Sequence, residues 1–258
     1  MSLIFGSFDS DEHDVIATLR ALPSFAGLQV ETLEAPGSDG QLLGGTTRTK
    51  ARYVFDVILR GESPEEVGAL RDEVALLLDP QRGLQDLVFD AAPGWRWAAI
   101  VAEVIEWERT TWGQGAGYQL RGDVAFDALE AFGRRVIDES WTHDGPIDRT
   151  VVRTEGNARS YPAVEIEGAL TASQSVTVTV SNVTVTVAGP LAAGEVLRLD
   201  YDGYDFGRWR GGVKTASVIR GMSTLARPEI WPQVATPFRV ATTGTVRKAV
   251  LRANSRRQ

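Results

Sequence analysis

Three aspartates in the second half of the chain bring together the oxygen atoms that a cation needs. The run DYDGYDFG contains Asp200, Asp202 and Asp205. Calcium prefers such carboxylate oxygens, but the run lacks the residue order of an EF-hand loop and has no glutamate in register downstream. A solvated turn at the end of a strand is the favoured interpretation, with calcium binding as the alternative, and no metal site is predicted.

Histidine and cysteine chemistry has little material in this sequence. The chain has 2 histidines and 0 cysteines, which excludes disulfides and cysteine-ligated zinc. His13 and His143 stand among acidic residues without a nucleophile motif nearby, so they are interpreted as surface histidines. No catalytic residue is predicted. A hydrolase that uses carboxylates from distant strands remains an alternative, because sequence spacing cannot exclude such a pair.

The glycine-rich segment GQGAGYQLRG could suggest a phosphate-binding loop. It lacks the G-K-[ST] ending, and its flanks have the pattern of two strands instead of a strand and a helix. The segment therefore predicts the tip of a β-hairpin, and no nucleotide or other cofactor is expected.

Tryptophans are concentrated in one stretch of the first half. In EWERTTWG, charged residues flank two of them, which is typical of the edge of a protein–protein interface. Core packing is the other explanation for members of this group. The four interface candidates are Trp95, Trp97, Trp107 and Trp112.

The overall composition limits the class of protein. With 258 residues, 43% of them hydrophobic, the chain can form one large domain or two ordinary ones. A net charge of −7 argues against wrapping DNA, since phosphate neutralisation needs clustered lysine and arginine. We expect no secretory signal and no membrane span, because the start has no basic segment and no apolar run is long enough.

The sequence patterns in the first half of the chain predict several strands and one well-formed helix. The run ESPEEVGALRDEVALLLDPQRG has Ser63 as helix cap, Pro64 at the first helical position and Glu66 in a capping box. The spacing of apolar residues also predicts a short helix in residues 9–27. Strand patterns occur in KARYVFDVILRG, LQDLVFD, RWAAIVAEVIEWERT and GYQLRGDVAFDA, whereas FDALEAFGRRVI fits a helix or a strand.

The segment SVTVTVSNVTVTV, residues 175–187, predicts a β-hairpin with a two-residue loop at Ser181-Asn182. Such a loop places six valines on one face and the threonines on the other. A two-stranded hairpin is marginal in water, so the valine face must cover another sheet. Only short strands follow, and the composition changes near residue 153, which predicts domains at residues 1–152 and 153–258.

The order of these segments resembles the distal tail proteins of long-tailed, non-contractile bacteriophages. The resemblance runs through APGSDGQLLGG and YVFDVILRG, the helix SPEEVGALRDEVALLLDP, and the hairpin VAEVIEWERTTWGQGAGYQLRGDVAFDA. It continues through GNARSYPAVEIEG and VTVTVSNVTVTVAGPLAAGEVLRLD. It implies a mainly β protein, with an N-terminal β-rich, ring-forming belt domain and a C-terminal galectin-like β-sandwich.

The resemblance implies a structural, non-enzymatic role in the tail tip of the virion, after assembly in the host cytoplasm. A hexameric ring would join the tail tube protein, at the end of the tube, to the tip or baseplate. It would also dock receptor-binding and other tail-associated proteins. The tape-measure protein and DNA would pass through its lumen. Six copies would carry a charge of about −42, which would repel DNA phosphates within a Debye length of about 8–10 Å.

A carbohydrate-binding module for host adhesion is the main alternative function. It predicts an exposed aromatic platform on the second domain, for which the candidates are Tyr201, Tyr204, Phe206 and Trp209. Direct sugar binding is not implied by the galectin-like resemblance, because a fold by itself does not confer a function.

Overall fold

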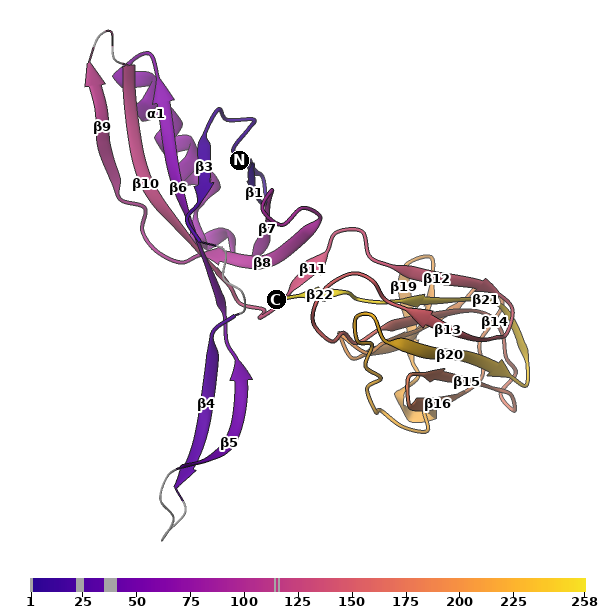
Figure 1. Cartoon of the computed structure of the whole chain (residues 1–258). Coiled ribbons are helices and arrows are strands. Elements are labelled where there is room, and N and C mark those ends of the chain that lie inside the picture. The colour runs from indigo at the N-terminus through magenta and orange to yellow at the C-terminus, as the bar shows by residue number, and fades with distance from the viewer. Residues whose placement is uncertain (1, 22–25, 35–40, 114, 116) are drawn as a thin grey trace. The chain divides into compact units, whose positions relative to one another are not determined.

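The computed structural model divides into two compact units, Met1–Val136 and Ile137–Arg257. It describes residues 2–21, 26–34, 41–113, 115 and 117–258. Strands dominate both units, so the chain is mainly β with one α-helix (Figure 1). This confirms the predicted fold class.

The first unit contains the following elements: β1 (Leu3–Phe5), β2 (Phe8–Asp9), β3 (Ile16–Leu19), β4 (Leu28–Glu34), β5 (Gln41–Arg48), β6 (Ala51–Gly61), α1 (Pro64–Leu77), a 3₁₀ turn η1 (Pro80–Arg82), β7 (Gln85–Phe89), β8 (Trp95–Val101), β9 (Trp107–Gly113), β10 (Gly117–Ala128) and β11 (Gly133–Arg135). Its main sheet has the order β2-β1-β7-β8-β10-β6-β3, with β9 paired to β10 and β11 to β8. Strands β4 and β5 form a separate two-stranded sheet.

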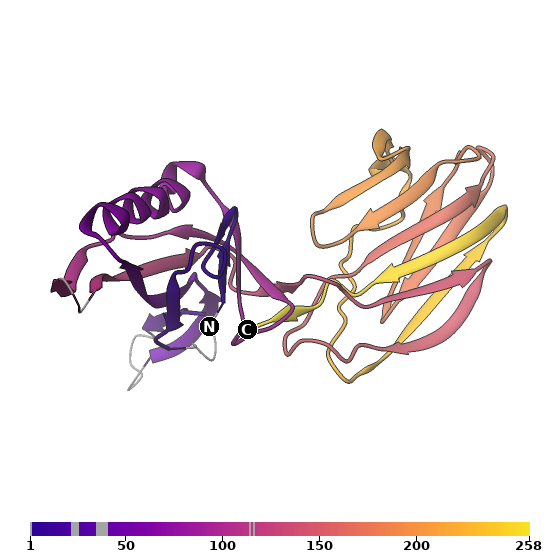
Figure 2. The same cartoon turned by 90° about the horizontal axis from the view of Figure 1, so that it is seen from above.

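Alternation along β6 builds the core of the first unit. Its inward residues are buried, and they include Tyr53, Phe55 and Val57. The helix α1 covers this face with Val67 and Val74, both fully buried (Figure 2). Gly61 is required at the end of β6, because a Cβ there would lie 2.7 Å from Cγ2 of Val67.

The helix α1 begins as the sequence predicts. The Ser63 hydroxyl accepts a hydrogen bond of 3.1 Å from the backbone N–H of Glu66. The Glu66 carboxylate in turn accepts one of 2.7 Å from the backbone N–H of Glu62. The first bond satisfies a donor that the first helical turn leaves without an intrahelical partner, and the second fixes the chain just before the helix.

The helix predicted within residues 9–27 is wrong for the described part of that range. Residues Ile16–Leu19 form strand β3, which pairs antiparallel with Phe55–Ile58 of β6. Pairing with the long strand β6 outweighs a local helical pattern, because β3 gains ladder hydrogen bonds along one side while Ala17 becomes fully buried. The ambiguous segment 126–137 also forms no helix and ends in β11.

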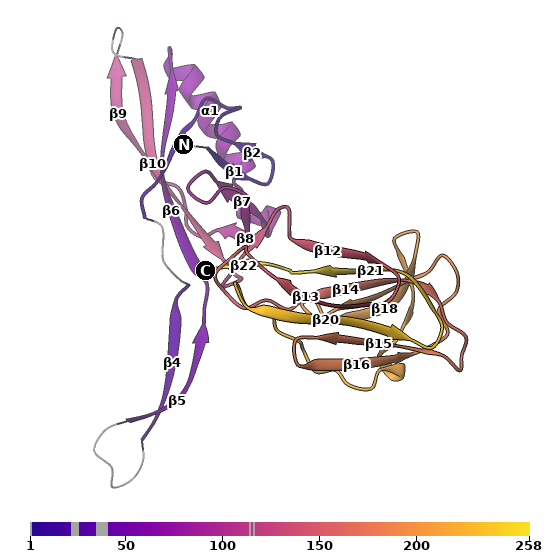
Figure 3. The same cartoon turned by 45° about the vertical axis from the view of Figure 1, so that its right-hand side comes forward.

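The second unit contains β12 (Ser140–Asp144), β13 (Ile147–Val152), β14 (Ala163–Ala169), β15 (Ser175–Val180), β16 (Val183–Ala188), β17 (Val196–Asp200), β18 (Asp205–Arg210), β19 (Val213–Ser217), a 3₁₀ turn η2 (Ile219–Gly221), β20 (Ala235–Thr242), β21 (Thr245–Arg252) and β22 (Arg256–Arg257). A six-stranded sheet of order β12-β21-β14-β17-β18-β19 packs on a four-stranded sheet of order β13-β20-β15-β16 (Figure 3). This unit is a β-sandwich.

The hairpin β15–β16 has the predicted register. Val180 pairs with Val183, Val178 with Val185, and Val176 with Val187. All of these valines are buried except Val183, which lies half-buried next to the loop. On the other face, threonine hydroxyls bond across the strands: Thr177 to Thr186 at 3.0 Å and Thr179 to Thr184 at 2.9 Å.

The boundary between the units lies earlier than the predicted position between residues 152 and 153. Strand β12 pairs with β21, and β13 pairs with β20, so residues 140–152 belong to the sandwich. The Gly and Pro residues that suggested a linker lie in turns within the second unit. Turns inside a domain and linkers between domains share the same composition, and only strand pairing distinguishes them.

Candidate assembly interface

The four tryptophan candidates have different environments. Trp95 and Trp97 lie in the core of the first unit, 3% and 2% exposed. Their burial leaves almost no surface for a partner, so the structure removes both from the candidate interface. Trp107 is half-buried against the same core. Trp112, which is 40% exposed, has the largest accessible surface of the four and stays a predicted interface residue.

The aromatic candidates for a sugar platform do not form one. Tyr201 and Phe206 are each 1% exposed and belong to the sandwich core. Burial raises the pKa of Tyr201 to about 12, as expected for a phenol away from water. Tyr204 is 53% exposed, but its ring stacks on the Arg227 guanidinium, 4.4 Å away. Trp209 is half-buried, with the Arg198 guanidinium 5.7 Å from its ring centre, so Tyr204 is the one well-exposed member of the four predicted aromatic residues.

The aspartates considered for calcium bind cationic side chains instead. Asp200 accepts a hydrogen bond from Arg198 at 3.0 Å, Asp202 pairs with Arg256, and Asp205 pairs with Lys214. Within the described residues, no group of three or more His, Cys, Asp or Glu side chains is placed to hold a metal ion. Asp200 also accepts hydrogen bonds from the backbone N–H groups of Asp202 and Gly203, which supports the interpretation of this run as a turn at the end of a strand.

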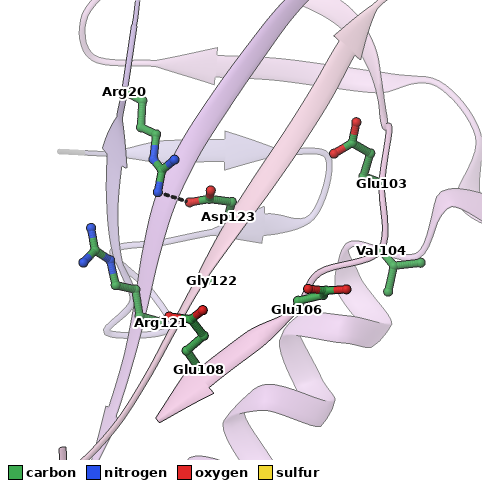
Figure 4. A pocket seen from close by; sticks show the side chains of 8 residues that line it. All are labelled: Arg20, Glu103, Val104, Glu106, Glu108, Arg121, Gly122 and Asp123. Carbon is green, nitrogen blue, oxygen red and sulfur yellow. Dashed lines mark ion pairs between the residues drawn. The ribbon is translucent and has the colours of Figure 1, made fainter. Parts of the chain in front are cut away.

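An acidic groove of about 640 Å³ lies over the face of the first unit's sheet that is remote from α1 (Figure 4). Its lining residues are Arg20, Glu103, Val104, Glu106, Glu108, Arg121, Gly122 and Asp123. Asp123 forms an ion pair of 2.6 Å with Arg20, and Arg121 binds Asp56 at 2.8 Å. The lining thus combines four carboxylates with two guanidinium groups, which makes the groove a strongly charged surface.

The hairpin β4–β5 presents the most unusual surface of the first unit. Every described side chain in it is exposed or half-buried, and the apolar ones are among the most exposed of the chain: Leu28 (52%), Val30 (50%), Leu33 (61%) and Leu43 (69%). A two-stranded hairpin without a covered face is marginally stable in water. The surface therefore has the properties of an element that a partner completes.

Three of these apolar residues share one face of the hairpin. Leu28 pairs with Arg48, Val30 with Thr46 and Thr32 with Leu43, and alternate residues of β4 lie on the same side. The bulge between Glu31 and Thr32 leaves Gly44 of β5 without a partner in the ladder, so Leu43 lies on the side of Val30. We call Leu28, Val30 and Leu43 the hairpin apolar face.

An ion network fixes the base of this hairpin to the main sheet. Asp127 on β10 is 6% exposed, and its carboxylate binds Lys50 and Arg52, with 2.9 Å from Arg52 Nε to Oδ1. Backbone bonds between Gly27 and residues 49–50 close the base. Burial alone would raise the pKa of Asp127, but the bonds from Arg52 and Lys50 outweigh it and lower that pKa below its ordinary value.

Replacing Asp127 by asparagine keeps the shape and removes the charge that Lys50 and Arg52 bind. We expect a loss of about 1–3 kcal/mol in the free energy of unfolding at pH 7. The pKa of Asp127 is lower in the folded state than in the unfolded state. The extra free energy of unfolding of the wild type is therefore fully present above the unfolded carboxyl pKa of about 3.9, and it disappears as the pH falls through the folded-state pKa. Urea unfolding of both proteins between pH 7 and pH 2.5 measures this, and a difference independent of pH would contradict it.

The sequence reasoning missed the hairpin apolar face. It identified only a turn in APGSDGQLLGG, of which residues 35–40 lie outside the described residues, and it assigned no strand to LQVETLE. The alternation of Leu28, Val30 and Thr32 was the available signal. That signal predicts a strand, but it gives no information on whether the apolar side is covered.

Comparison with known proteins identifies the architecture. Residues 15–117 match the family described as phage tail protein RIFT-related domain. The crystal structure of the Dit protein of phage SPP1, described as a paradigm of the hub adsorption apparatus in phages that infect Gram-positive bacteria, aligns over 99% of this chain and 98% of that chain, with a TM-score of 0.70 and 12% identity. No curated protein matches the chain.

Two structures of the phage p2 baseplate in its activated conformation, one with Ca and one with Sr, each align over 100% of this chain and 97% of theirs. Their TM-score is 0.47 and the identity 10% in both cases. The match to SPP1 Dit extends through both units and the family match covers most of the first. Residues 15–117 are therefore similar to the phage tail protein RIFT-related domain, and the chain has the fold of SPP1 Dit, in agreement with the resemblance of its sequence segments.

Proposed function

We propose that the chain is a structural protein of a phage tail tip, where its copies associate head to tail into a ring. The resemblance to distal tail proteins implies six copies. The ring would join the end of the tail tube to the tip or baseplate proteins, and the proposed role requires no catalytic step. The observation that carries the proposal is the hairpin apolar face, which no part of the described chain covers.

A head-to-tail contact explains why this face stays open in one copy. When two different patches of a protein fit each other, repeated association generates a ring or an open filament. The hairpin forms its own two-stranded sheet, and both of its strands precede β6 at the base described above. An element of this kind can be covered by a neighbouring copy without rearrangement of the core.

The distribution of charge supports passage of DNA through such a ring. Residues 1–136 contain 12 basic and 22 acidic side chains, a net charge of −10, whereas residues 137–258 contain 15 basic and 12 acidic side chains, a net charge of +3. The net negative charge of the chain thus lies in the first unit, which is the unit that the resemblance predicts to form the ring. An acidic lumen repels phosphates at short range and keeps DNA from binding.

The test is the solution mass of the purified chain, measured by light scattering and native mass spectrometry over a range of concentrations. We expect a species of six 28.0-kDa chains, about 168 kDa. Leu28→Asp should shift this species toward monomer, because it places a charge on the hairpin apolar face. Leu225→Asp is the control and should leave the mass unchanged, because this leucine of the second unit has a similar exposure, 48% against 52% for Leu28.

Two results would contradict the proposal. One is a monomer at every concentration, alone and on isolated tail tubes. The other is a ring that forms equally well with Leu28→Asp.

A further inference from the structure

An arginine and a tryptophan near the tip of the β9–β10 ribbon form a preassembled contact group. The Arg109 guanidinium lies 4.5 Å from the centre of the Trp112 ring. The Tyr118 ring meets Trp112 edge-on, with centroids 5.2 Å apart at 89°. The stacking holds both side chains in place, so little conformational entropy remains to be lost when they bind.

This group has surface and charge available for a partner. Trp112 is 40% exposed, and Arg109 forms no ion pair within the described part of the chain. A cation without a carboxylate partner is unexpected in a unit whose acidic residues outnumber its basic ones. Arginine and tryptophan are also the residues most enriched among those that dominate binding at protein interfaces.

The solvent-facing side of α1 carries carboxylates and an exposed leucine, which complement the charge of Arg109 and the apolar ring of Trp112. Glu65, Ala69, Asp72 and Leu76 are all exposed and recur at helical spacing, so they form one stripe, which we call the helix stripe. Leu76 is 62% exposed. Among the residues that the structure describes, Asp72 pairs only with its exposed neighbour Arg71, and a surface pair of this type contributes about 0–1 kcal/mol.

Gly68 beside the stripe has no explanation within a single copy. A Cβ at this position would have nothing within 4 Å, and glycine in an exposed helix costs about 1 kcal/mol relative to alanine. Because glycine has no side chain, the surface of α1 is flat next to Ala69. A planar ring can approach the helix backbone closely at such a place.

We propose that the Arg109–Trp112 pair of one copy binds the helix stripe of the next copy, an inference that rests on the proposed ring. Arg109 would bind the carboxylates of Glu65 and Asp72, while the indole of Trp112 lies on the area between Gly68 and Leu76. The two surfaces are different patches of the same unit, as a head-to-tail ring requires. Their opposite charges fix the direction in which the copies associate.

Charge reversal tests the pairing. Arg109→Glu should weaken association about tenfold or more, and adding Glu65→Arg and Asp72→Arg should restore most of it, because the attraction is re-formed with opposite sign. Arg149→Glu, at an exposed arginine of the second unit, is the matched control and should have no effect. Thermal unfolding of each variant at low concentration confirms that the monomer remains folded.

Cross-linking gives an independent test, because the chain has 0 cysteines. Gly113→Cys copies are mixed with Gly68→Cys copies that carry a larger tag, and a short bis-maleimide is added. Both positions accept a Cβ with nothing within 4 Å. We expect a cross-linked product containing one chain of each kind, and none when Thr184→Cys replaces Gly68→Cys.

The outcomes separate this inference from the proposed function. If the wild-type ring forms, while Arg109→Glu assembles normally or the mixed cross-link does not exceed the Thr184→Cys control, the inference is overturned and the ring stands. If the wild type never associates, both are overturned. Loss of assembly by Arg109→Glu with rescue by the reversed stripe, together with the mixed cross-link, supports the inference.

Discussion

Replacing Val178 by aspartate is expected to unfold the second unit. Val178 is 1% exposed, and it pairs with Val185 on one side and Val240 on the other, in the middle of the four-stranded sheet. A carboxylate here has no cation to pair with and must either lose its charge or draw water into the sandwich. Substitutions of this kind cost about 4 kcal/mol or more, against a total stability of about 5–15 kcal/mol.

The neighbouring residue supplies the control. Thr179 points to the opposite face, where its hydroxyl binds that of Thr184 at 2.9 Å. Thr179→Asp should therefore cost about 1 kcal/mol, the value of one exposed hydrogen bond. Limited proteolysis followed by mass spectrometry measures both variants, since cleavage confined to residues 137–257 indicates unfolding of this unit alone. Equal resistance of the two variants to proteolysis would contradict the register of β15, which places Val178 inside the sandwich and Thr179 outside it.

Replacing Phe126 by alanine should give the largest loss of stability in the first unit. Its ring is fully buried and lies 4.8 Å from that of Phe5 and 5.7 Å from that of Phe55, measured between centroids. These three rings join strands β10, β1 and β6, which are far apart in sequence. Truncating a buried phenylalanine removes its transfer free energy and leaves a cavity, at a cost of about 3–5 kcal/mol.

Denaturant unfolding monitored by tryptophan fluorescence measures this loss, because Trp95 and Trp97 lie in the same core. Phe132→Ala is the matched control: this ring is half-buried and contacts the Arg48 guanidinium at 5.6 Å, so we expect a smaller cost. If Phe126→Ala costs no more than Phe132→Ala, the aromatic cluster does not hold the sheet together.

The proposed ring and these stability predictions are independent of each other. Val178→Asp and Phe126→Ala act on buried contacts within one unit, whereas Leu28→Asp and Arg109→Glu act on exposed side chains. The first pair changes unfolding at any protein concentration. The second pair changes association while leaving the unfolding of a single copy nearly unchanged, since exposed substitutions usually cost within about 0.5 kcal/mol.

Local sequence patterns were sufficient to predict the elements whose structure depends on residues close together in the chain. Ser63, Pro64 and Glu66 lie within one helical turn, and they start α1 where the sequence predicts. The alternation of residues 175–187 around a two-residue loop gives the pairing of β15 with β16. In both cases the decisive hydrogen bonds and side-chain directions are set within a few residues.

Other features depended on contacts between residues far apart in the sequence. The segment at Ile16–Leu19 has a helical spacing but pairs with β6, and residues 140–152 look like a linker but pair with β20 and β21. Similarly, Trp95 and Trp112 stand in the same stretch of sequence, yet one is buried and the other exposed. No local pattern distinguishes them.

The sequence by itself therefore determined the mainly β class, the single capped helix, the valine-faced hairpin and the likeness to distal tail proteins. Only the tertiary structure decided where the two units divide, which tryptophans reach the surface, and that the hairpin apolar face stays uncovered. The physical reason is that secondary structure follows from periodicity along the chain. Exposure is instead a property of the packed molecule, set by which distant segments lie over each side chain.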